Sequence, residues 1–95
     1  MKNDLKPVLT RSQYAGVHFG YLAHREGKEV TLERSRRIWS WSGAWTLSEI
    51  ATKGLDQKKS KVAATVPEIT LTEVCEIITC TPEGVASIEG AQWVK

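Results

Sequence analysis

The chain has 95 residues, of which 41% are hydrophobic and 25% are charged, and its formal net charge is +2 at pH 7. These values predict one globular domain, residues 1–95, with one modest core, and they exclude a disordered, collagen-like or multidomain chain. The mild charge also argues against a dedicated duplex-DNA binder, because such proteins draw most of their affinity from neutralising phosphates.

The first residues, MKNDLKPVLTRSQ, lack the apolar run of a secretory signal. No stretch of the sequence approaches the roughly 18 apolar residues of a membrane span. We therefore expect a protein of the bacterial cytoplasm with no membrane partner.

Apolar residues alternate along VHFGYLAHREGKEVTLE, which predicts two strands joined by a hairpin. A two-residue turn at Glu26 and Gly27 and a three-residue loop with Gly27 as a bulge both fit this segment. The first turn gives the cross-strand pairs Ala23–Val30, Tyr21–Leu32 and His24–Glu29, and the second pairs Leu22 with Val30.

The segment RRIWSWSGAWTLSEIA, residues 36–51, combines two adjacent arginines with three of the four tryptophans. If a strand runs unbroken from Glu29 through Trp41, the indoles at positions 39 and 41 face away from the aliphatic core. One face then carries Val30, Leu32, Ile38 and Ser40, and the other carries Thr31, Glu33, Ser35, Arg37, Trp39 and Trp41. A bulge within ERSRR, residues 33–37, would shift the register by one residue and turn both indoles inward.

A helix is predicted to begin at Leu47, after the capping box formed by Thr46 and Glu49. Trp45 and Ile50 have the spacing of a hydrophobic staple, which predicts that this third tryptophan has a structural role. The helix has about seven residues and ends at Gly54, so it must dock on the sheet to be stable.

The remainder of the chain predicts a solvated loop over residues 56–61, then strands, then a second helix. VAATV and EITLTEVCEIITC are rich in β-branched residues, and Pro67 between them suits an edge or a break. The helix in CTPEGVASIEG has Thr81 as N-cap, Pro82 at its first position, Val85 and Ile88 inward and Gly90 as its stop. AQWVK would form a short closing strand. The predicted class is α+β, a small, mostly antiparallel β-sheet or partly open barrel with two short helices.

The residue types that carry catalysis or bind metals form no recognisable constellation. His18 and His24 share a strand face about 20 Å apart, too far to chelate one ion, and we expect both at the surface. Cys75 and Cys80 are five residues apart on one predicted strand, so their side chains point to opposite faces and remain reduced. We therefore predict no enzyme activity, no metal and no cofactor.

The arginines and tryptophans form the candidate binding surface, because both residue types are enriched at binding hot spots. The arginines have a plainer interpretation, as a solvated strand edge that discourages aggregation. The candidate partner-binding residues are Arg34, Arg36, Arg37, Trp39 and Trp41, and the candidate phosphate contacts are Lys58, Lys59 and Lys61.

Two long stretches of the chain resemble a family of small bacteriophage and prophage proteins with no assigned function. These stretches, residues 15–54 and 66–95, cover most of the chain, and their most recognisable segments are GYLAHREGKEVTL, RRIWSWSGAWTLSEIA and EIITCTPEGVASI. Trp45 departs from the small residues that this family has after its Gly-Ala pair. The resemblance implies a phage or prophage origin and a cytoplasmic setting, and it brings no catalytic residues.

Together these features predict an accessory binding protein that inhibits or sequesters a host defence factor, as an anti-CRISPR protein does. Its partner would be a host protein or ribonucleoprotein complex. Two alternatives stay open. One is a nucleic-acid or nucleotide binder that uses the surface formed by these arginines and tryptophans, and the other is a structural or assembly protein of the virion. Each is compatible with a homo-oligomer, because a small domain with exposed indoles and strand edges often self-associates.

Overall fold

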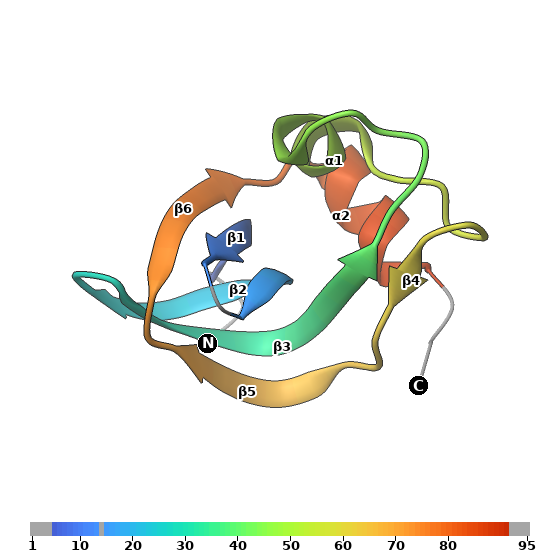
Figure 1. Cartoon of the computed structure of the whole chain (residues 1–95). Coiled ribbons are helices and arrows are strands. Elements are labelled where there is room, and N and C mark those ends of the chain that lie inside the picture. Colours follow the sequence, from blue (N-terminus) through green and yellow to red (C-terminus); the bar gives the residue numbers. More distant parts are fainter. Residues whose placement is uncertain (1–4, 14, 92–95) are drawn as a thin grey trace.

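The computed structural model describes residues 5–13 and 15–91, and its six strands and two helices confirm the predicted α+β class (Figure 1). All strand pairs are antiparallel, in the order β4-β3-β2-β1-β6, with β5 pairing with β3 beside β4. The elements are β1 (Lys6–Ser12), β2 (Gly16–Glu26), β3 (Glu29–Ser40), α1 (Leu47–Lys53), β4 (Lys61–Val62), β5 (Val66–Leu71), β6 (Val74–Thr79) and α2 (Pro82–Glu89). The predicted closing strand AQWVK lies outside the described residues apart from Ala91.

The hairpin between β2 and β3 turns one residue later than the predicted two-residue turn, at Gly27 and Lys28. Gly27 has a φ of 60°, which suits the first central position of a tight hairpin turn and is readily adopted by glycine. Both predicted registers are therefore wrong, since the observed pairs are Glu26–Glu29, Arg25–Val30, His24–Thr31 and Leu22–Leu32.

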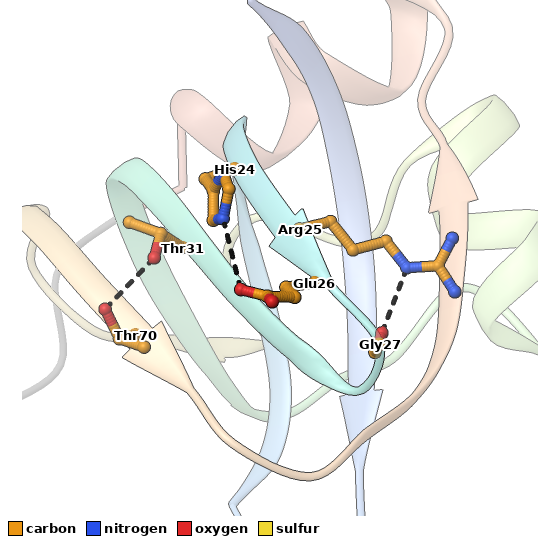
Figure 2. A network of polar contacts seen from close by, with 6 residues as sticks. All are labelled: His24, Arg25, Glu26, Gly27, Thr31 and Thr70. Carbon is orange, nitrogen blue, oxygen red and sulfur yellow. Dashed lines mark hydrogen bonds and ion pairs between the residues drawn. The ribbon is translucent and has the colours of Figure 1, made fainter.

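The side chains near this turn follow the observed register. His24 lies 4.0 Å from the carboxylate of Glu26 on its own strand (Figure 2). It pairs with Thr31 across the strands and not with Glu29. The Thr31 and Thr70 hydroxyls are 3.1 Å apart and join β3 to β5.

A β-bulge interrupts β3 within the ERSRR segment, as one of the two predicted registers required, but the prediction that it turns both indoles inward is wrong, because Trp39 is exposed. Arg34 has a φ of 51°, and Glu33 pairs with Tyr21 while Arg36 pairs with Phe19. Two residues of β3 thus oppose the single Gly20 of β2. Compared with an unbroken strand, the side chains after the bulge therefore lie on the opposite face of the sheet.

Because of this bulge, β3 contributes to a separate hydrophobic cluster on each face of the sheet. Val8 and Leu9 are consecutive residues of β1 and belong to different clusters, so the clusters lie on opposite faces. One, the helix-side core, holds Leu9, Phe19, Ile38, Ile50, Ala51, Leu55, Val62, Cys80, Ile88 and Ala91. The other, the corner core beside the β5–β6 turn, holds Val8, Val30, Leu32, Leu71 and Val74.

Helix α1 begins at Leu47 and ends before Gly54, as predicted, but the hydrophobic staple is wrong. The Thr46 hydroxyl accepts a 3.2 Å hydrogen bond from the Glu49 N–H, and the Glu49 carboxylate accepts one from the Trp45 N–H at 2.8 Å. The indole of Trp45 is nevertheless 92% exposed, whereas Ile50 is fully buried. Since Ile50 points into the helix-side core, it offers the indole no exposed face to pack on.

Helix α2 confirms its predicted boundaries, with Thr81 as N-cap, Pro82 at the first turn and Gly90 at its end. The strands before it are shorter than predicted. VAATV contributes the last residue of β4 and the first of β5, and EITLTEVCEIITC divides at Thr72 and Glu73 into β5 and β6. Pro67 lies inside β5, which pairs only with β3 within residues 5–13 and 15–91, so the proline occupies an edge strand.

Both cysteines are free, as expected, and they differ in environment. Cys75 is exposed on β6, and Cys80 is buried just beyond the end of that strand. Burial raises the pKa of the Cys80 thiol to about 12, which keeps it protonated and unreactive at neutral pH.

Candidate binding surfaces

Arg36 lies in the interior, where its guanidinium joins the end of α2 to β4. The side chain is only 3% exposed. Its five N–H groups match five backbone carbonyl contacts of 2.7–3.4 Å, to Val62, Ala63, Ile88, Glu89 and Ala91. Burial lowers the pKa of this guanidinium, and the Glu89 carboxylate partly offsets that effect. We therefore leave Arg36 out of the candidate binding surface.

Arg37 and Trp39 remain together at the surface, on the sheet face opposite Ile38. The Arg37 guanidinium carbon lies 4.5 Å from the centroid of the Trp39 ring, within range of a cation–π contact, and the indole is 56% exposed. Alternation along β4 directs Lys61 to the same face, since its neighbour Val62 is buried in the helix-side core. We call Arg37, Trp39 and Lys61 the Arg/Trp face.

Arg34 forms a separate stack against Tyr21. Its guanidinium carbon is 3.9 Å from the ring centroid. The Tyr21 hydroxyl donates a 2.6 Å hydrogen bond to Glu89. Burial, with help from this bond, raises the pKa of Tyr21 to about 12, so the phenol stays neutral beside the cation. Arg34 and Arg37 are thus engaged by different aromatic side chains.

Trp41 lies beyond the end of β3 and packs partly against the helix-side core. It lines a groove of about 420 Å³ together with Trp45 and Leu47 on one wall. The opposite wall carries Val17, Ile78 and the Arg11–Glu76 ion pair, whose closest nitrogen and oxygen are 4.0 Å apart. We call this cavity the tryptophan groove.

Lys58 and Lys59 are exposed in a tight loop after α1. The Asp56 carboxylate accepts hydrogen bonds from both lysine backbone N–H groups, at 3.0 Å each. These bonds, that of Lys59 first, lower the pKa of Asp56. The Asp56 N–H in turn donates to the Ser42 carbonyl at 2.8 Å, which holds the loop against the segment between Trp41 and Trp45.

The predicted site residues therefore divide among several places. Arg37, Trp39 and Lys61 share one face, Trp41 belongs to the groove, Arg34 stacks on Tyr21, and Arg36 is internal. Sequence reasoning missed Arg11, Glu76 and Trp45 as groove residues. For Trp45 the sequence did offer a signal, because this tryptophan stands where the resembling phage proteins have small residues after their Gly-Ala pair.

His18 corrects the expectation of two surface histidines, because it is only 4% exposed. It pairs across the strands with Arg37, and its Nδ1 atom has no hydrogen-bond partner within the described part of the chain. Burial, and secondarily the charge of Arg37, lower the pKa of His18 to about 4. His18 is therefore neutral in the folded protein near pH 7.

Acidification is expected to destabilise the protein through His18. The pKa of this side chain falls from 6.5 to about 4 on folding, so the unfolded chain binds the proton more tightly. The contribution of His18 to the free energy of unfolding is therefore complete above pH 6.5 and is lost as the pH falls toward 4. The expected loss is roughly 2–3 kcal/mol between pH 7.5 and pH 4.5. Urea denaturation at both pH values should show that His18→Gln lacks this part of the pH dependence. His24→Gln, at an exposed position, should retain it, and equal pH dependence in wild type and His18→Gln would contradict the assignment.

The fold and these surfaces define a small α+β protein with two separate sets of solvent-facing aromatic side chains. Residues 5–88 match the family model described as Domain of unknown function (DUF6948), and the chain belongs to that family. No curated protein and no solved structure matches it. None of the helices in the described residues is long and apolar enough to cross a membrane.

Proposed function

We propose that this protein is a phage- or prophage-encoded accessory protein that binds a host factor stoichiometrically and thereby inhibits or sequesters it. The observation that carries the proposal is the exposure of two indoles, 56% at Trp39 and 92% at Trp45. The resemblance to small phage proteins supplies the setting, and a host defence protein or ribonucleoprotein is the partner we favour.

Leaving these indoles in water is energetically unfavourable for so small a domain. Burying a tryptophan contributes roughly 4–6 kcal/mol before opposing terms, and the net stability of a domain is only about 5–15 kcal/mol. Exposed tryptophan next to arginine is the composition of binding hot spots, where a partner removes the indole from water. The Arg/Trp face and the tryptophan groove are therefore the surfaces that a partner would cover.

The double substitution Arg37→Ala/Trp39→Ala is expected to reduce partner recovery strongly, because it removes both members of the stacked pair. Tagged wild-type and variant proteins would be recovered from infected host cells and their bound proteins quantified by mass spectrometry. Lys53→Ala is a matched control at an exposed position of α1 outside both surfaces and should recover the partner normally. If the folded Arg37/Trp39 variant recovers every partner as wild type does, the Arg/Trp face is not the binding surface.

A nucleic-acid or nucleotide binder is the second candidate, favoured by the cation–π pair of Arg37 and Trp39 with Lys61 on the same face. In that case a base would stack on the indole and the cations would meet phosphate. It predicts quenching of tryptophan fluorescence by oligonucleotides or cyclic nucleotides, with an affinity that falls steeply as salt rises. Unchanged fluorescence with these ligands would remove this candidate.

A further inference from the structure

Strand β6 lies at one edge of the sheet formed by the described residues. Within the described residues it pairs with β1 alone, and it lies at the rim of the sheet in Figure 1. The Cys80 N–H donates to the Pro7 carbonyl on the β1 side, so alternation directs the backbone groups of Ile77 and Thr79 to the open side.

The first half of β6 is occupied on that side by the hairpin between β2 and β3. The Val74 N–H donates to the Lys28 carbonyl at 3.0 Å, and Arg25 and Gly27 line a pocket together with Val74 to Ile77. Figure 2 shows the Arg25 side chain extending from the hairpin toward β6. The open part of the edge is therefore short, from Ile77 to Thr79.

This open edge adjoins the tryptophan groove. Glu76 and Ile78 are alternate residues of β6, and both line the groove that Trp41 and Trp45 close from the other wall. A strand added to β6 would direct every second side chain toward this face of the sheet. The outward-facing backbone N–H and C=O groups of β6 and the tryptophan groove thus lie side by side.

We propose that the Ile77–Thr79 edge and the tryptophan groove together bind an extended segment of a partner protein. The segment adds to the sheet as a strand and inserts an apolar side chain into the tryptophan groove. This inference rests on the proposed function and deepens it, since it names the kind of segment that the partner presents.

The chemistry of the surface favours a polypeptide as its occupant. The open edge presents alternating N–H and C=O groups, which a peptide backbone complements in register. The charges on the groove wall are one cation and one anion, Arg11 and Glu76, both substantially exposed and only loosely paired at 4.0 Å. This balance suits a segment that carries charges of both signs beside its apolar residue, and Glu76 disfavours a phosphate backbone.

Selection from a displayed library of linear octapeptides against the immobilised full chain tests the inference directly. Selected peptides should share an apolar residue, and Trp45→Ala should weaken their binding by roughly tenfold or more. Thr79→Pro removes an outward N–H at an exposed edge position and should weaken binding similarly. Val66→Ala, at an exposed apolar position on the edge strand β5, is the matched control and should change affinity by less than about twofold.

The peptides themselves provide a test that leaves the protein unchanged. N-methylation of every second amide should abolish binding in one frame and preserve it in the other, because only one side of an added strand bonds to β6. Equal effects of both frames, or unchanged affinity for Trp45→Ala, would overturn the inference. So would a dimer in sedimentation that Trp45→Ala or Thr79→Pro dissociates, since a second copy would then occupy the edge.

Failure of this inference is distinguishable from failure of the proposed function. Trp45→Ala and Thr79→Pro proteins can be carried through the same recovery from infected cells. If they keep the host partner while Arg37→Ala/Trp39→Ala loses it, the binding function holds and the β6 site is excluded. If the first two lose the partner and the selected peptides compete with it, both proposals are supported.

Discussion

Replacing Arg36 with alanine is expected to destabilise the protein by roughly 3–5 kcal/mol, a large part of the stability of a domain this size. The guanidinium supplies hydrogen bonds to five carbonyls on two separate segments, residues 62–63 and 88–91. Its removal leaves a cavity and buried acceptors without donors. Urea denaturation followed by circular dichroism measures the loss.

Two further substitutions separate the hydrogen-bond network from charge alone. Arg36→Lys keeps the positive charge but has three donors on one nitrogen, so it should give an intermediate loss of stability. Arg37→Ala is the adjacent control and should cost less than about 1 kcal/mol, because it removes a partly exposed cation and its stack on Trp39. Equal losses for Arg36→Ala and Arg37→Ala would contradict the structural role of Arg36.

Gly84→Ala is expected to destabilise the protein by about 2–3 kcal/mol, against the usual trend for this substitution in a helix. Alanine in place of glycine ordinarily stabilises a helix by roughly 0.5–1 kcal/mol. Here a methyl group at position 84 would lie 2.1 Å from the Ala51 carbonyl oxygen and 3.0 Å from that of Ile50. Because backbone atoms cannot move aside as a side chain does, the two helices must separate and loosen the helix-side core.

Thermal unfolding measures this effect, with a loss of about 4–8 °C in melting temperature for each kcal/mol. Glu83→Ala, at the exposed neighbouring position of α2, is the control and should stay within about 0.5 kcal/mol of wild type. A Gly84→Ala protein as stable as wild type would mean that the helices do not approach this closely.

The helices could be predicted from sequence because their signals are local. Thr46 with Glu49, and Thr81 with Pro82, lie within four residues of the backbone groups that they cap or start. The hairpin register was missed because Gly27 suits either of two adjacent turn positions, and the choice depends on pairing farther along β3. The predicted hydrophobic staple between Trp45 and Ile50 was wrong because Ile50 packs in the helix-side core. That is a long-range contact, which residue spacing does not specify.

The candidate site was less predictable than the fold for the same reason. Arg36 and Arg37 are chemically identical neighbours, and only the bulge at Arg34 sends the first inward and the second outward. The carbonyls that receive Arg36 lie 26–55 residues away in sequence, beyond any local pattern. The tryptophan groove likewise joins Arg11, Trp45 and Glu76 from three distant segments.

The bulge at Arg34 also determines how this chain tolerates changes in length. Elsewhere, a residue gained or lost in a surface loop alters only the loop. Deleting one residue at positions 33–35 would remove the extra residue, so a single residue of β3 would oppose Gly20 and the later residues would keep their partners on β2. Deleting Arg37, where residues of β3 and β2 pair one to one, would instead move Trp39 into the interior position of Ile38, so β3 tolerates the loss of a residue at its bulge and not beside it.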